Sequence, residues 1–151
     1  GRPMTLGSLL SKTSTLMKMI FNKQIKDAGE SITIEQWVLL SILYRTEGIK
    51  QTEIARIGLK DRTNITRMVD LLEKGQYLRR EKDANDRRAH RIYINERGRR
   101  SVEALNPISD EVNRIALADF SPEEAQTLIG LLEKLQASLA SRATSPPPQP
   151  K

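Results

Sequence analysis

Short polar and basic side chains between positions 62 and 67 have the chemistry that reads the edges of DNA bases. They are Arg62, Thr63, Asn64, Thr66 and Arg67. Arginine can bond guanine O6 and N7 in a fork, and asparagine can bond adenine N6 and N7 in the same way. Threonine hydroxyls can reach phosphates or bases. The pattern predicts a helix for the major groove, and the alternative is an ordinary amphipathic helix whose polar face is only solvated.

A second basic cluster lies between positions 81 and 90, in a stretch with few apolar residues. Arg87, Arg88 and His90 are the candidates for a contact with the minor groove, where narrow A·T tracts concentrate negative potential. Asp83 and Asp86 lie among these basic residues. A carboxylate can pair with an arginine and hold a loop in shape. The alternative is a flexible charged loop.

The excess positive charge is confined to one stretch of the chain. Residues 60–100 hold 13 Lys and Arg against 7 Asp and Glu, while the rest of the chain holds 12 of each, and the net charge is +6. A basic segment on a neutral body is typical of a surface that binds a polyanion. A surface that is merely solvated usually mixes both signs.

The composition excludes several kinds of site. The chain has no cysteine, which excludes disulfides, thiolate metal sites and thiol-based redox sensing. His90 is the one histidine, so a zinc site is not expected, and neither a metal nor a cofactor is predicted. The usual nucleophile–base pairs and phosphate-binding glycine loops are missing, so the chain is not expected to be an enzyme.

No targeting or membrane segment is predicted. No apolar run approaches the ~20 residues needed to span a bilayer, and nothing at the start resembles a signal peptide. We therefore expect a cytoplasmic protein without a membrane partner.

Hydrophobic periodicity predicts a mainly helical chain with one hairpin of short strands. Helices are expected at about 5–28, 33–46, 51–57, 62–74, 95–115 and 122–141, and strands at 77–80 and 91–94. The residues between the strands, 81–90, are expected to form a solvated loop. Pro107 predicts a bend in the fifth helix.

Helix starts and stops carry their own signals. Thr33 with Gln36 has the pattern of a capping box, and Ser121-Pro122-Glu123-Glu124 is a second start signal. Asp61 and Asn95 are expected N-caps, and Gly75 is expected to be the left-handed residue after the fourth helix. The buried face of that helix is expected to consist of Ile65, Met68, Val69, Leu71 and Leu72.

The order of elements predicts a mainly α (α+β) fold, a winged helix-turn-helix with flanking N- and C-terminal dimerisation helices. Residues 1–4 are expected to be a cloning remnant or disordered, and 143–151 a disordered Pro-rich tail. The dimerisation helices are expected at 5–30 and 101–142, around a DNA-binding lobe at 31–100. Only 38% of the residues are hydrophobic and 4% aromatic. Such a thin core favours completion by a second subunit, and the alternative is a small polar monomer.

Two motifs make the chain resemble the MarR family of bacterial transcription regulators. Asp86-Arg87-Arg88 followed by Ile92-Tyr93-Ile94-Asn95-Glu96-Arg97-Gly98 is similar to the D-R-R…L-T-x-x-G signature of the family's wing. Leu71-Leu72-Glu73-Lys74-Gly75 is similar to its L-E-x-x-G turn. The chain has Asn95 where the family usually has Thr. The element order extends the resemblance over about residues 5–141.

The resemblance implies a homodimeric, sequence-specific DNA-binding regulator, most often a repressor, on a pseudo-palindromic operator of double-stranded DNA. It places Arg62, Thr63, Asn64, Thr66 and Arg67 in the major groove and Arg87 or Arg88 in the minor groove. It also implies that Asp86 pairs with Arg88 to stiffen the wing. A small aromatic or phenolic effector would release the DNA. A winged helix that binds protein instead remains the alternative.

Overall fold

The computed structural model describes residues 5–58 and 62–143, without the side chains of residues 58, 62 and 63. Its elements are, in order, α1 (Leu6–Asp27), α2 (Ile34–Arg45), β1 (Ile49–Lys50), α3 (Gln51–Gly58), α4 (Arg62–Lys74), β2 (Leu78–Lys82), β3 (His90–Ile94), α5 (Glu96–Ala116) and α6 (Pro122–Ala143). The chain divides into two compact units, Gly1–Val112 and Asn113–Lys151. The expected cap Asp61 lies outside the described residues.

The capping box predicted at the start of α2 is confirmed. The N–H of Gln36 donates to Thr33 Oγ1, and the N–H of Thr33 donates to Gln36 Oε1, both at 3.1 Å. These bonds satisfy amide groups that have no partner inside the helix. Helix α1 packs on α2 where the rings of Phe21 and Trp37 lie 5.5 Å apart.

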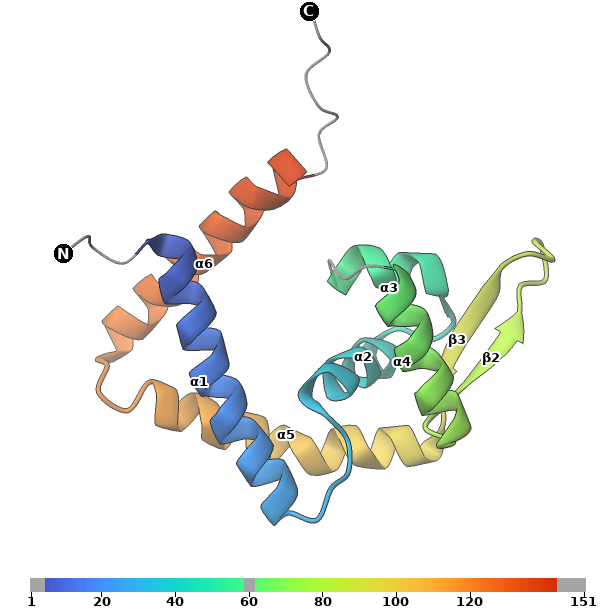
Figure 1. Ribbon diagram of the computed structural model, residues 1–151, viewed down its shortest axis with the longest axis horizontal. Helices are drawn as coiled ribbons and strands as arrows, with labels where there is room; N and C mark the ends of the chain where they lie inside the picture. The colour runs from blue at the N-terminus through green and yellow to red at the C-terminus, as the bar shows by residue number, and fades with distance from the viewer. Residues whose placement is uncertain (1–4, 59–61, 144–151) are drawn as a thin grey trace, which may run out of the picture. The chain divides into compact units, whose positions relative to one another are not determined.

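The core of the first unit lies between the helices and the sheet. Its fully buried side chains come from α2, α3, α4, α5 and both long strands; they are Leu40, Leu43, Ile54, Leu72, Leu78, Ile92, Leu105, Val69 and Val112. Burial of one such side chain stabilises the fold by about 1.5–3 kcal/mol. Figure 1 shows α3 and α4 beside the β2–β3 hairpin, which extends away from them.

The sheet contains a strand that the sequence did not predict. β1 pairs antiparallel with β3, placing Ile49 opposite Ile92, and the strand order is β1-β3-β2. Two residues are too few to show the alternation that identifies a strand. The expected loop at 81–90 is also wrong in its bounds, because β2 continues to Lys82 and β3 begins at His90. Backbone pairing needs no apolar side chain, so the strands extend into polar sequence.

The expectation for Gly75 is wrong, because the left-handed residue after α4 is Gln76, with φ 65°. The N–H of Gln76 donates to Glu73 O at 2.9 Å, and the N–H of Tyr77 donates to Leu72 O at 2.9 Å. These two hydrogen bonds form a Schellman motif at the end of the helix. The motif places its left-handed residue one position later than we expected. Gly75 instead makes room, since a Cβ there would lie 2.9 Å from the Tyr77 ring.

The predicted buried face of α4 is correct for Ile65, Val69 and Leu72 and wrong for Leu71. Leu71 is 55% exposed, and Met68 is half-buried. Positions 65, 69 and 72 form one stripe that faces the core, and position 71 falls beyond its edge.

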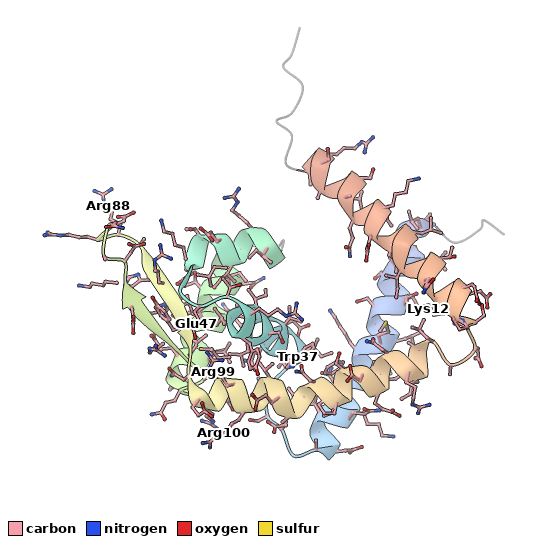
Figure 2. The ribbon with its side chains drawn as sticks, turned by 180° about the vertical axis from the view of Figure 1, so that it is seen from behind. Lys12, Trp37, Glu47, Arg88, Arg99 and Arg100 are labelled. Atoms are coloured by element: carbon pink, nitrogen blue, oxygen red, sulfur yellow. The ribbon has the colours of Figure 1, made fainter. Side chains whose placement is uncertain are left out.

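Helix α5 is tied to α2 within the first unit by side chains from both helices. Arg99 Nη2 donates to Glu47 Oε1 at 2.8 Å, beside the end of α2, and its guanidinium lies over the ring of Tyr44. The Tyr44 hydroxyl donates to Glu103 Oε1 at 2.9 Å. Figure 2 labels Arg99 and Glu47 at this junction.

The side chain of Asn95, the expected cap of α5, is engaged elsewhere. Its Nδ2 donates to Gln76 O at 3.2 Å, and its Oδ1 accepts from Arg79 Nη1 at 3.0 Å. Asn95 therefore joins the start of α5 to the turn after α4. The helix itself runs on through Pro107.

Helix α6, in the second unit, begins as the sequence predicted. The N–H of Glu124 donates to Ser121 Oγ, and the N–H of Ser121 donates to Glu124 Oε1. No residue of this helix is buried. Over the described ranges, no helix is both long enough and apolar enough to span a bilayer.

Candidate nucleic-acid interface

The polar candidates of helix α4 whose side chains are described lie outside its buried stripe. Asn64 and Arg67 are exposed and Thr66 is half-buried, while Ile65 and Val69 face the core. The other two candidates, Arg62 and Thr63, begin the helix, but their side chains lie outside the described residues. The helix therefore presents polar side chains to solvent from its first half onward.

Two clefts divide these candidates between them. Thr66 lies in a cleft of about 240 Å³ between α3, α4 and the β2–β3 hairpin. Asn64 and Arg67 line another cleft, of about 260 Å³, on the side of α4 that faces the start of α2. The structure thus groups Thr66 with the hairpin and separates it from Asn64 and Arg67.

The hairpin brings the remaining candidates to its distal end. Arg87, Arg88 and His90 are all exposed, and Figure 2 shows Arg88 at the tip of the hairpin. Arg88 and His90 also line the 240 Å³ cleft that contains Thr66. Residues of the hairpin and Thr66 of α4 therefore line one shared cleft.

Asp86 contacts Arg88 in a different way from the side-chain pair that the resemblance implied. The carboxylate Oδ1 of Asp86 accepts from the backbone N–H of Arg88 at 3.0 Å. The N–H of Ala89 also donates to Asp86 O at 3.1 Å, which closes a turn. Asp86 therefore shapes the backbone of the loop and leaves the placement of the Arg88 guanidinium to other contacts.

An ion pair at the base of the wing loop joins Asp83 and Arg91. Arg91 Nε donates to Asp83 Oδ2 at 3.1 Å, and Lys50 Nζ lies 3.9 Å from the same oxygen. The N–H of Asn85 donates to Asp83 Oδ1 at 2.9 Å. The Asp83 side chain is only 3% exposed, so a buried carboxylate organises the base of the loop.

The pKa of the Asp83 carboxyl lies below its ordinary value. The main cause is the hydrogen bond from the Asn85 N–H, and the charges of Arg91 and Lys50 lower it further, whereas burial acts in the opposite direction. Hydrogen bonds and nearby cations favour the ionised form. Asp83 is therefore a carboxylate throughout the neutral range.

Several residues of this region were not among the sequence candidates. Lys50, Gln51 and Thr52, where β1 passes into α3, line the cleft with Thr66. Arg80 of β2 donates to carboxylates of both Asp70 and Glu73 on α4. The polar Lys50-Gln51-Thr52 run, shortly after the break at Gly48, was the one signal for the first group. Nothing local in the sequence indicated the role of Arg80.

A helix that follows a short helix and precedes a hairpin on a three-stranded sheet defines the class of the fold, a winged helix-turn-helix. A sequence profile described as "MarR family" matches residues 32–90. The solved structure of a probable transcriptional regulator from Pseudomonas aeruginosa is 30% identical, with 87% of this chain and 96% of that chain covered and a TM-score of 0.77. The chain belongs to the MarR family of transcriptional regulators.

Two further relatives agree with this placement. MepR of S. aureus, solved as a complex with DNA, is 27% identical over 90% of this chain and 99% of that chain, with a TM-score of 0.81. The HTH-type transcriptional regulator YybA of Bacillus subtilis is 25% identical over 120 residues, which make up 80% of this chain and 79% of YybA. Members of a family of transcriptional regulators are not enzymes, as the composition led us to expect.

Proposed function

We propose that this regulator binds double-stranded DNA sequence-specifically, with α4 in the major groove and the β2–β3 hairpin as a wing at the minor groove. The observation that carries the proposal is the shared cleft, in which Thr66 of α4 faces Arg88 and His90 of the wing. A helix in the major groove has phosphates and a minor groove on its flank. A cation-bearing wing beside the helix is placed to meet them.

The solved complex of MepR with DNA supports this proposal, because that protein shares the fold at 27% identity. We assign base reading to Arg62, Thr63, Asn64, Thr66 and Arg67 and minor-groove contact to Arg87, Arg88 and His90. Free access to chromosomal DNA implies a cytoplasmic location.

The direct test is fluorescence anisotropy with duplexes that the purified protein selects from fragmented genomic DNA. We expect selected duplexes to bind about 10³-fold or more tightly than unrelated duplexes. Affinity for both should fall steeply with salt, since phosphate contacts release counterions. No binding to any duplex at low salt would overturn the proposal.

We also propose that the regulator is a homodimer whose dimerisation helices are α1, the end of α5 and α6. Large apolar side chains on these helices are exposed in the single chain; they are Leu6, Leu9, Leu16, Met17, Met19, Ile20, Ile115, Leu128, Ile129, Leu131 and Leu139. Water-exposed apolar surface on this scale marks a protein interface. A two-fold dimer would place two α4 helices on half-sites about 34–36 Å apart, on a pseudo-palindromic operator.

We further propose that the protein is a repressor that a small aromatic acid or phenol releases from DNA. An apolar cavity of about 220 Å³ lies under α4, between α1 and α2, lined in part by Val38, Ile42 and Met68. Lys18 lines it too, 3.5 Å from Glu35, and offers a cation to a carboxylate. Because Met68 belongs to α4, a ligand here contacts the reading helix from behind.

Calorimetric titration with benzoate and with phenol tests the effector site, together with their effect on the selected duplex. We expect binding to lower DNA affinity, because the ligand and DNA favour different placements of α4. Val38→Trp should fill the cavity and abolish this response while DNA affinity is kept. An unchanged response in Val38→Trp, or no heat with either probe, would overturn the site.

A further inference from the structure

A chain of hydrogen bonds runs from the base of the wing to the reading helix. Arg80 of β2 donates from Nε to Gln51 Oε1 at 3.2 Å. Gln51, the first residue of α3, donates from Nε2 to Thr66 Oγ1 on α4 at 3.2 Å. One continuous path therefore links three elements and ends on a side chain assigned to DNA.

Arg80, at one end of this chain of hydrogen bonds, is bonded through both its side chain and its backbone. Its Nη1 donates to Glu73 Oε1 at 2.8 Å and its Nη2 to Asp70 Oδ1 at 2.5 Å, while its backbone N–H donates to Glu73 Oε2 at 3.1 Å. The side chain is 18% exposed. A planar guanidinium whose two terminal nitrogens are both paired has its Nε–H fixed in one direction.

The fixed Nε–H determines which way the amide of Gln51 faces. An arginine offers donors and no acceptor, so Gln51 must turn its oxygen toward Arg80. Its NH2 group is then directed at Thr66. The reversed amide would set donor against donor at Arg80, so the network itself selects the orientation.

We propose that Arg80 and Gln51 are positioning residues, which hold Thr66 in one rotamer for sequence reading. A threonine in a helix divides between two χ1 rotamers, and a donor fixed beside Oγ1 favours the rotamer that meets it. Thr66 and Gln51 both line the cleft that Arg88 and His90 share. The inference rests on the proposed DNA-binding function and adds residues outside α4 to its specificity.

The test uses the full-length protein and two duplexes, the best one that it selects from a random pool and an unrelated one of equal length. The readout is the ratio of the two affinities. Gln51→Leu changes no charge, removes both hydrogen bonds and keeps a similar volume. We expect it to lower the ratio by about five- to tenfold, the lower part of the range for losing one base contact.

A double-mutant cycle separates positioning from a general structural effect. Thr66→Val removes the hydroxyl and keeps the shape, and we expect it to lower the ratio at least as much as Gln51→Leu. If Gln51 acts through Thr66, the double variant Gln51→Leu/Thr66→Val should match Thr66→Val alone. Melting temperatures of the variants report any loss of folding. A merely structural role would lower the melting temperature and leave the affinity ratio unchanged.

Arg80→Met tests the residue at the other end of the hydrogen-bond chain, against a matched control. Arg79→Met removes the same charge from the adjacent residue, whose guanidinium bonds Glu81 and Asn95 instead. We expect only Arg80→Met to lower the ratio. Additive losses in the Gln51/Thr66 cycle, or an unchanged ratio in Gln51→Leu, would overturn the inference and leave DNA binding intact. A parent protein that does not distinguish the duplexes would instead overturn the proposed function.

Discussion

The guanidinium of Arg91 is held between two segments, with Nε on the carboxylate of Asp83 and Nη1 on Gly48 O at 2.6 Å. Asp83 closes the wing loop, and Gly48 precedes β1 in the same sheet. One arginine of the basic stretch therefore has a structural role, and it ties the wing to the strand that leads into α3.

Asp83→Asn should destabilise the folded protein at neutral pH, because Arg91 and Lys50 lose their anionic partner. The pKa of Asp83 is lowered in the folded state, so its stabilising effect is complete above the unfolded value of about 3.9. It is lost as pH falls through the lower folded value. Urea unfolding of parent and variant from pH 7 to pH 3 should show the difference shrinking below about pH 4. A difference that grows toward low pH would contradict this assignment.

Arg88→Ala should weaken DNA binding and leave the wing loop ordered, because Asp86 bonds the backbone N–H of residue 88. The expected loss is about 1–3 kcal/mol if the side chain enters a groove. Asp86→Ala should instead loosen the loop while it retains every cation. Amide hydrogen exchange in the loop and duplex affinity distinguish the two variants.

Arg67→Ala should cost about 1–3 kcal/mol of binding to the selected duplex and relax sequence preference, as loss of a base contact does. Arg100→Ala is a matched control for charge, because Arg100 lies on α5, where it pairs with Glu96 at 3.5 Å. Anisotropy titrations against the selected duplex and single-base variants measure both effects. Equal losses of affinity in the two variants would show that Arg67 contributes only its charge and reads no base.

Gln76→Gly should raise the free energy of unfolding by about 1 kcal/mol, because glycine adopts a positive φ without the cost that a side chain imposes. The bond from Asn95 to Gln76 O involves only the backbone at position 76 and is retained. Gln76→Val should destabilise, since a β-branched side chain fits this region poorly. Chemical denaturation of both variants measures whether each substitution raises or lowers the free energy of unfolding.

Leu131→Glu should convert the proposed dimer into monomers with an unchanged fold. Leu131 is 59% exposed, so the substitution should change the stability of the monomer little. A carboxylate inside an apolar interface, by contrast, is costly. Sedimentation velocity measures the mass, and circular dichroism reports the helices. Gln136→Glu, at an exposed polar position of the same helix, should remain dimeric.

Features set by neighbouring residues were predictable from the sequence. The capping boxes at Thr33 and Ser121 depend on side chains within one helical turn. The surplus positive charge in residues 60–100 likewise indicated α4 and the wing as the candidate DNA-binding surface.

Features set by distant pairing were not predictable. β1 exists because Ile49 meets Ile92, and Leu71 is exposed because the core ends beside Leu72. The chain from Arg80 through Gln51 to Thr66 joins residues that lie 29 and 15 positions apart. No window of local sequence reveals such a contact.

The bonds inside the wing loop have a thermodynamic consequence for binding. Asp83 and Asp86 fix the turn from within, through the N–H groups of Asn85, Arg88 and Ala89. Immobilising a free residue costs about 1–2 kcal/mol of conformational entropy. A loop already ordered in the unbound protein avoids most of that loss when it meets a ligand. The two acids repel phosphate, yet by pre-ordering the loop that carries Arg87 and Arg88 they make the attraction of those arginines more effective.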